Sequence, residues 1–213
     1  MSLNSNLTLL TLDKAKILNR LGVRTVLTSL MSADAALNDS LANSKGALEK
    51  VVRGIRIARE EGLWVAVNMV VTKKNLHDIF STARLVKELG VNAFSATKAS
   101  RPIGSSDFSE YALSNQDLNI MLGELLRVKG ELGLNVDSLE FYPHCSFESP
   151  ETREIFGNRI CNAGKTACTI GHDGMIRPCS HASMTYGSVT EGLANCWEKL
   201  YPWRTDAFIP VKC

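Results

Sequence analysis

The stretch Trp64-Val-Ala-Val-Asn-Met-Val-Val71 decides the fold. It is apolar apart from Asn68, and β-branched valines dominate it. A nearly continuous apolar run of this length is typical of a strand in a parallel sheet, because such a strand is buried on both faces. The sequence therefore predicts a parallel sheet with this strand inside it.

The segments on both sides of this strand alternate between helix and strand patterns. In chain order we expect a helix over residues 12–21, a strand over 23–29, a polar stretch over 32–44, a helix over 47–61, the strand 64–71, a helix between 75 and 90, a strand over 91–97, a helix over 116–132 and a strand over 136–142. The four expected strands are half of an eight-unit (β/α) barrel or most of an open doubly wound sheet. No glycine-rich phosphate-binding motif occurs, so a nucleotide-binding open sheet has no support.

Composition and charge exclude several classes of protein. The chain has 213 residues, of which 45% are hydrophobic and 22% charged, as in ordinary globular proteins. With 24 basic and 22 acidic residues the net charge is +2, which gives no electrostatic reason to expect a nucleic-acid or membrane partner. No apolar run is long enough to span a bilayer, and no signal peptide is visible. We therefore expect a cytoplasmic protein.

The six cysteines all lie between Cys145 and Cys213. Clustering at one end of a chain indicates a local metal or cluster site in a reducing compartment rather than a disulfide framework. The segments also become shorter after Pro143, with a hairpin expected to turn on Asp173-Gly174, a helix over 191–203 and an extended end over 209–213. We therefore expect two domains, residues 1–144 and 145–213.

Cys161 and Cys179 flank the predicted hairpin. Twelve residues separate Cys161 from Gly174, and four separate Gly174 from Cys179. Because a hairpin brings its two ends together, these thiolates are expected to converge on one metal centre. Thiolates are soft ligands that suit iron–sulfur clusters or zinc, and a disulfide is a further alternative for the pair.

The cysteine-bearing region resembles a known family. Cys161-x-Ala-Gly164, Asp173-Gly-x-Ile-x-Pro-Cys-Ser-His181 and Tyr186-Gly-Ser-Val189, followed by Trp197 and Arg204, are similar to the SPASM domain of radical S-adenosylmethionine (SAM) enzymes. That domain carries auxiliary [4Fe–4S] clusters. The resemblance implies that Cys161, Cys179 and Cys213 are cluster ligands.

The first half resembles the partial barrel of the same enzymes, through Thr25-Val-Leu-Thr-Ser-Leu30 and Val67-Asn-Met-Val-Val-Thr-Lys-Lys-Asn75. The resemblance implies a partial TIM-like barrel of about four βα units followed by a small cysteine-rich hairpin-and-helix domain. It places Ser29 and Asn68 against SAM, at the C-terminal ends of adjacent strands together with the region 97–104. Arg101 is a candidate for binding a carboxylate. Structural hydrogen bonding explains Ser29 and Asn68 equally well, and a surface loop explains Arg101.

The sequence also departs from the family pattern. The Cys-x-x-x-Cys-x-x-Cys motif that holds the catalytic cluster is absent, because no cysteine precedes Cys145. We therefore interpret the chain as a piece of a longer protein and expect it to be inactive alone. Ser180 follows Cys179, where sulfatase-maturing members have the aspartate that serves as base.

The resemblance implies that the intact protein uses a 5′-deoxyadenosyl radical to modify a peptide, with a quinone-cofactor or haem pathway as the next possibility. Its implied partners are a peptide substrate and a reductant such as flavodoxin or ferredoxin. The rival hypotheses are a non-catalytic zinc or iron–sulfur module that recruits a peptide, and a generic barrel lyase with incidental cysteines. Cys168 and Cys196 are interpreted as small buried hydrophobic residues, and Cys145 follows a predicted strand end.

Overall fold

A computed structural model describes residues 1–101 and 107–205 of the chain. It divides into two compact units, one made of Met1–Ser100 with Ser109–Gly157 and the other of Arg101–Phe108 with Asn158–Cys213. We call these the first unit and the second unit. The predicted end over residues 209–213, with Cys213, and Gly104 lie outside the described residues.

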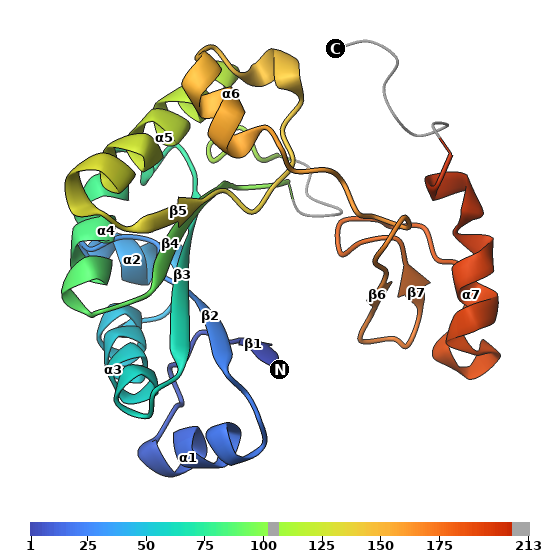
Figure 1. Cartoon of the computed structure of the whole chain (residues 1–213), viewed down its shortest axis with the longest axis horizontal. Helices are drawn as coiled ribbons and strands as arrows, with labels where there is room; N and C mark the ends of the chain where they lie inside the picture. Colours follow the sequence, from blue (N-terminus) through green and yellow to red (C-terminus); the bar gives the residue numbers. More distant parts are fainter. Residues whose placement is uncertain (102–106, 206–213) are drawn as a thin grey trace. The chain divides into compact units, whose positions relative to one another are not determined.

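The first unit is built on a parallel sheet in the order β1-β2-β3-β4-β5 (Figure 1). Its strands are β1 (Ser2–Asn4), β2 (Thr25–Ser29), β3 (Trp64–Val71), β4 (Ala93–Lys98) and β5 (Asn135–Asp137). Every pair of neighbouring strands is parallel. The prediction of a partial α/β barrel is confirmed, and β3 has the bounds expected from its sequence.

The helices of the first unit lie on one face of this sheet (Figure 1). They are α1 (Leu12–Arg20), α2 (Ala35–Leu41), α3 (Ala47–Glu60), α4 (Ile79–Glu88) and α5 (Asn115–Arg127), with short helical turns η1 (Leu76–Asp78) before α4 and η2 (Val128–Leu132) after α5. In β3, Val65, Val67 and Met69 are fully buried on the helix side, whereas Asn68 is half-buried on the other. The expectation that β3 is buried on both faces is therefore met on one face only. The other face is the one available to a ligand.

Three elements of the first unit differ from the sequence prediction. Helix α2 lies within the polar stretch 32–44, where Asp34 caps it by accepting from Leu37 N. Strand β1 was not expected, and it extends the sheet beyond β2. The strand predicted over 136–142 is limited to β5, because the chain then bends and Ser138 Oγ bonds the Tyr142 hydroxyl at 2.9 Å.

Residues 143–157 also belong to the first unit and pack against α5 and the main core. They form η3 (His144–Ser146) and α6 (Pro150–Phe156). Asn119 of α5 donates to Ser146 O at 2.8 Å and accepts from Glu148 N at 2.9 Å, while Phe156 is buried in the main core. The compact unit thus extends to Gly157, thirteen residues past the domain boundary expected after residue 144.

The second unit contains the predicted hairpin, formed by β6 (Thr169–Ile170) and β7 (Ile176–Arg177) in antiparallel register. Gly171 N donates to Met175 O, so the loop is the three residues 172–174, with Gly174 at φ 73°. The hairpin therefore turns on Asp173-Gly174 as expected, through a three-residue loop that ends on a left-handed glycine. The elements η4 (Val189–Glu191), α7 (Leu193–Lys199) and η5 (Tyr201–Trp203) follow.

A small core of Ile176, Cys196 and Leu200 holds the second unit together. Helix α7 ends at Lys199 instead of continuing to residue 203, because Pro202 cannot supply the backbone N–H that a longer helix needs. Across the described parts of both units, no helix combines the length and the apolar character needed to cross a membrane.

Candidate cofactor face and cysteine site

A row of polar side chains crosses the half-buried face of the sheet. Ser29 of β2 pairs in register with Asn68 of β3, Asn68 pairs with Ser95 of β4, and Ser95 pairs with Asp137 of β5. Residues in one register row of a parallel sheet point to the same face. The predicted juxtaposition of Ser29 and Asn68 on adjacent strands is therefore confirmed. Ser29 ends its strand, whereas Asn68 lies three residues before the end of β3.

Asn68 is the centre of this row. Its Oδ1 accepts hydrogen bonds from Ser95 Oγ at 2.9 Å and from Thr97 Oγ1 at 2.8 Å. In this arrangement no described residue accepts a hydrogen bond from Asn68 Nδ2. The two interpretations of Asn68, structural hydrogen bonding and cofactor contact, therefore both have a physical basis. Its oxygen accepts structural hydrogen bonds, and its amide N–H donors remain available to a ligand.

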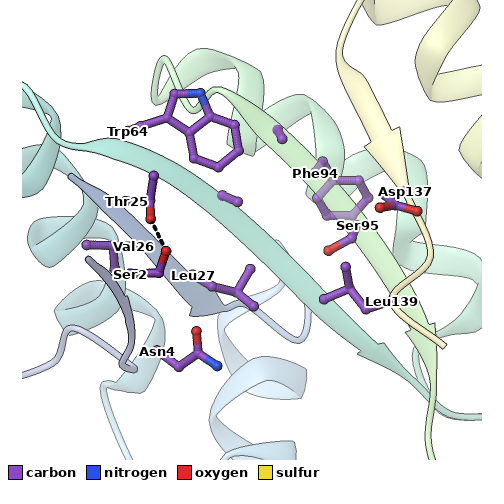
Figure 2. Close-up of a pocket in the computed structure, with 12 residues that line it drawn as sticks. Ser2, Asn4, Thr25, Val26, Leu27, Trp64, Phe94, Ser95, Asp137 and Leu139 are labelled. Atoms are coloured by element: carbon purple, nitrogen blue, oxygen red, sulfur yellow. Dashed lines mark hydrogen bonds between the residues drawn. The ribbon is translucent and has the colours of Figure 1, made fainter. Parts of the chain in front are cut away.

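A groove of about 450 Å³ lies over the N-terminal halves of β2, β3 and β4 and includes Ser95 and Asp137 of the row (Figure 2). Figure 2 shows Trp64 near one end and Leu139 with Asp137 near the other, while Thr25 Oγ1 donates to Ser2 Oγ at 2.6 Å on its floor. The side chains facing it combine an aromatic ring, aliphatic groups and one carboxylate. Such a lining suits an elongated molecule with both apolar and polar parts.

A second cavity, of about 340 Å³, lies at the C-terminal end of β2. Ser29, Lys50 and Arg53 line it together with residues of the loop after β1. The two cationic side chains bond only backbone carbonyls among the described residues: Lys50 Nζ donates to Lys45 O, and Arg53 donates to Thr8 O. Their positive charge is not neutralised by a carboxylate there, so the cavity suits an anionic group such as a carboxylate.

Asp39 fixes the start of α3, the helix that carries Lys50 and Arg53. Its carboxylate accepts hydrogen bonds from the backbone N–H groups of Gly46 and Leu48. These bonds, the one from Leu48 foremost, hold the pKa of Asp39 below its usual value, because they stabilise the charged form. The helix start is thereby capped by the protein itself.

Asn75 holds the chain that follows Ser29. Its buried side chain donates to Met31 O at 2.8 Å and to Val70 O at 3.0 Å, and it accepts from Thr72 N at 2.7 Å. The sequence predicted that a helix begins at about this position, yet the Asn75 side chain does not cap it. Asn75 instead joins the loops after β2 and β3, because three backbone groups there have no ladder partner.

Arg101 is exposed and follows β4 by three residues. It falls in the second unit, and residues 102–106 after it lie outside the described part of the chain. Its role toward a carboxylate stays a prediction.

Cys161 and Cys179 lie on chain segments that are joined by a hydrogen bond. Gly164, three residues after Cys161, shares its N–H between Ala167 O at 2.9 Å and Pro178 O at 3.2 Å, and Pro178 immediately precedes Cys179. Both cysteines are free thiols; Cys161 is exposed and Cys179 is half-buried. Within residues 1–101 and 107–205, no group of three or more His, Cys, Asp or Glu side chains is arranged to hold a metal ion. The described residues thus supply part of a ligand set, and Cys213 lies outside them.

The hairpin between the two cysteines is fastened at its turn. Arg177 donates to both carboxylate oxygens of Asp173, at 2.9 and 2.6 Å, and Met175 N donates to the same side chain. The Arg177 guanidinium, foremost, holds the pKa of the Asp173 carboxyl well below its usual range. The turn register therefore persists through the ordinary pH range.

The remaining cysteines have different surroundings. Cys196 is fully buried and donates to Ser188 O at 3.4 Å, and Cys168 packs against the same small core. Both positions fit the interpretation of cysteine as a small hydrophobic residue. Cys145 is exposed in η3.

Sequence reasoning missed Ser95 and Asp137 of the polar row, and Lys50 and Arg53 of the second cavity. The signal for Ser95 and Thr97 was present as alternation, since Ala93, Ser95 and Thr97 occupy every second position of β4. Lys50 and Arg53 gave no such signal, because charged residues on a helix are usually solvated.

The chain resembles proteins of one family in sequence and in structure. Residues 1–86 match the model of the radical SAM superfamily. An AdoMet-dependent heme synthase of Nitratidesulfovibrio vulgaris is 26% identical over 88% of this chain and 54% of its own length. The subtilosin biosynthesis protein AlbA of Bacillus subtilis is 34% identical over 32% of this chain and 15% of its own.

Solved structures share the fold. SuiB of Streptococcus suis bound to S-adenosylmethionine superposes with a TM-score of 0.73 at 20% identity, covering 96% of this chain and 48% of that one. AnSMEcpe with bound AdoMet gives a TM-score of 0.69 at 17% identity, covering 94% of this chain and 57% of that one. The chain thus spans about half the length of these relatives.

Proposed function

Residues 1–86 belong to the radical SAM superfamily, and from this membership we propose that the protein to which the chain belongs is a SAM-dependent radical enzyme that modifies a peptide. The observation that carries the proposal is the register of Ser29 and Asn68 on the half-buried face, beside a cavity with two cationic side chains. The proposal of a peptide substrate is supported by two similar proteins. The structure of SuiB has been solved with the precursor peptide SuiA, and AlbA is a subtilosin biosynthesis protein.

The residues of the first unit fit SAM by their chemistry. Ser29 Oγ and Asn68 Nδ2 are hydrogen-bond groups suited to the ribose hydroxyls or the amino-acid part. Lys50 and Arg53 offer positive charge to the carboxylate of SAM. SAM, when bound, would supply a 5′-deoxyadenosyl radical, and the buried core beneath the face would keep water from that side of it. Arg101 is proposed as a further carboxylate-binding residue.

We further propose that the cysteine-rich part of residues 145–213 that follows Gly157 forms an auxiliary domain, and that the first unit, which contains residues 1–100 and 109–157, is the barrel domain. The auxiliary domain's cysteines Cys161, Cys179 and Cys213 would be ligands of a [4Fe–4S] cluster, because thiolates are the ligands that such clusters take. The free thiols and the Gly164–Pro178 hydrogen bond support this assignment. A reductant such as flavodoxin or ferredoxin and a cytoplasmic location, where thiols stay reduced, complete the proposal.

This chain alone should generate no radical. No cysteine occurs among residues 1–144, so the barrel offers no thiolate to the cluster that cleaves SAM. Anaerobic reconstitution with iron, sulfide, SAM and dithionite should yield no 5′-deoxyadenosine above a protein-free control in liquid chromatography. Formation of 5′-deoxyadenosine by this chain would contradict that expectation.

The proposed cofactor face is tested by SAM binding, measured by saturation-transfer NMR titration. Ser29→Ala and Asn68→Ala should each weaken binding by roughly fivefold, the loss expected for one hydrogen bond. Thr25→Ala is the matched control, because Thr25 points to the same face at the opposite end of β2 and bonds Ser2. If Ser29→Ala and Asn68→Ala both bind SAM with wild-type affinity, or if Thr25→Ala loses as much affinity as they do, the proposed cofactor face is contradicted.

Metal content distinguishes the proposed iron–sulfur site from the rival hypothesis of a non-catalytic zinc module. Anaerobic reconstitution followed by iron, sulfide and zinc analysis should give iron and sulfide that depend on Cys161 and Cys179. Stable zinc without sulfide would favour the rival.

Haem synthesis is a second candidate function, because the heme synthase relative is similar over 88% of this chain. A tetrapyrrole substrate bound in the groove would lie beside the Trp64 ring. Tryptophan fluorescence that falls on titration with an iron-containing tetrapyrrole, and does so less in Trp64→Phe, would favour this candidate over a peptide.

A further inference from the structure

The segment after α7 contacts the loop that carries Cys161. Arg204 Nε donates to Gly164 O at 3.4 Å, and its terminal nitrogen donates to Trp197 O. The guanidinium carbon also lies 4.5 Å from the centre of the Trp197 ring, in cation–π contact. Arg204 therefore ties the end of α7 to the cysteine-bearing loop through backbone oxygens.

Trp203 closes against the same loop from the neighbouring position. Gly164 has φ 64°, and a Cβ atom there would lie 2.4 Å from Trp203 Cβ, so only glycine allows this approach. Trp203 Nε1 in turn donates to the Tyr186 hydroxyl at 2.7 Å, and Tyr186 N bonds Ile176 O of the hairpin. We call Trp203, Arg204 and Gly164 the clamp.

Both backbone polar groups of Gly164 are hydrogen-bonded. Its N–H donates to Pro178 O, beside Cys179, while its carbonyl accepts from Arg204. Asn162 O, next to Cys161, accepts from Lys165 N, so the loop itself is a tight turn. The position of Cys161 relative to Cys179 is therefore set through Gly164, and neither cysteine touches Arg204 or Trp203 in a described hydrogen bond.

Ion pairing does not explain Arg204. Its acidic neighbour is Glu198, at 3.9 Å, and that side chain is 76% exposed. A pair at this distance and exposure contributes little to stability. The hydrogen bonds of Arg204 go to the carbonyls of Gly164 and Trp197, which indicates that its role is to position backbone.

We propose that Arg204 and Trp203 are positioning residues, which hold the Cys161 segment beside Cys179 before any metal binds. The identity of the metal group rests on the proposed function. The positioning itself does not, because it concerns two thiols of the metal-free chain. If the two segments are held together, the Cys161 and Cys179 thiols have a high effective concentration toward each other. Metal binding then costs little conformational entropy, because the chain that carries the thiols is already ordered.

The test measures that effective concentration in the chelator-treated full chain. The protein is equilibrated anaerobically with reduced and oxidised glutathione, quenched with acid, and mapped by mass spectrometry for a Cys161–Cys179 disulfide. Arg204→Ala and Trp203→Ala should each lower the effective concentration on the order of tenfold, through loss of the charged hydrogen bonds and the ring contacts. Arg204→Lys should recover only part of it, because an ammonium lacks the planar fork.

Leu193→Ala is the matched control, since Leu193 is an exposed residue of α7 that makes no clamp contact. It should keep the wild-type value. Circular dichroism and amide exchange of the β6–β7 hairpin establish whether each variant is folded. If Arg204→Ala unfolds the hairpin, the thiol pairing measured in Arg204→Lys tests the proposal in its place. Wild-type thiol pairing in Arg204→Ala and Trp203→Ala, with the hairpin folded, would overturn the proposal.

A second measurement separates this inference from the proposed function. After anaerobic reconstitution, iron release to a chelator should be faster in Arg204→Ala than in Leu193→Ala, as followed by the loss of the charge-transfer absorption. Failure of the wild type to take up iron and sulfide would count against the auxiliary cluster. The glutathione experiment would still decide whether the clamp positions the thiols.

Discussion

Gly54→Ala is expected to destabilise the first unit by about 3 kcal/mol, at the upper end of the usual cost of overpacking. Gly54 lies in the middle of α3, and a Cβ atom there would be 2.3 Å from Leu7 O and 2.7 Å from Leu7 Cβ. Leu7 is buried and adopts φ 57°, so its backbone is already in a conformation that side chains resist. The contact can be relieved only by moving the loop after β1.

Gly123→Ala is the matched control for this prediction. Gly123 is also inside a helix, α5, but no heavy atom lies within 4 Å of the position a Cβ would take. Alanine should therefore stabilise the unit by about 0.5–1 kcal/mol, the usual difference in helix propensity. Amide exchange of β2 and β3 peptides measures both variants without interference from the second unit. Equal effects of the two substitutions would contradict the close contact of Gly54 with Leu7.

Asn75→Ala should cost about 3 kcal/mol, because it leaves several buried backbone groups without partners. The variant removes the acceptor of Thr72 N and the donor to Met31 O and Val70 O, at a position that is 1% exposed. The loops after β2 and β3 would lose their link. Ser29, two residues before Met31, would lose its fixed place, so we expect weaker SAM binding together with faster exchange of these loops.

Lys74→Ala tests whether this effect is specific to the buried amide. Lys74 is the preceding residue and pairs at the surface with Glu110 and the ring of Tyr111. Surface ion pairs contribute about 0–1 kcal/mol, so this variant should be close to wild type. Urea unfolding followed by amide exchange of the β2 and β3 peptides compares the two. A loss in Lys74→Ala as large as that in Asn75→Ala would show that the loop, rather than the network, carries the stability.

The sheet was predictable because its determinants are local. The apolar run of β3, the helical periodicity of α3 and the capping pair Ser114–Asp117 of α5 each lie within one segment. The structure places β3, α3, and α5 together with η2, within one residue of their expected bounds. Ser29 and Asn68 could be placed on one face because parallel register follows from the alternation of strands and helices.

Other features depend on contacts between distant segments. Strand β1 has only three residues, and its strand character comes from pairing with β2 rather than from its own sequence. Asn75 follows the pattern of a helix cap, yet its bonds go to Met31, which lies forty-four residues earlier. Gly164 bonds the nearby Ala167 O, but Pro178, Trp203 and Arg204 are remote in sequence, so its cramped position beside Trp203 has no local signal except the glycine itself.

The clamp also has a consequence for how the protein is made. Arg204 follows the glycine it binds by forty residues, so a ribosome must extend the chain well past both Cys161 and Cys179 before the grip can form. Until then the hairpin has only its own turn bonds, such as those between Arg177 and Asp173, and the Cys161 segment lacks its contacts with Arg204 and Trp203. Under the proposed positioning role, the two thiols are held together only once this short aromatic and cationic segment has been synthesised.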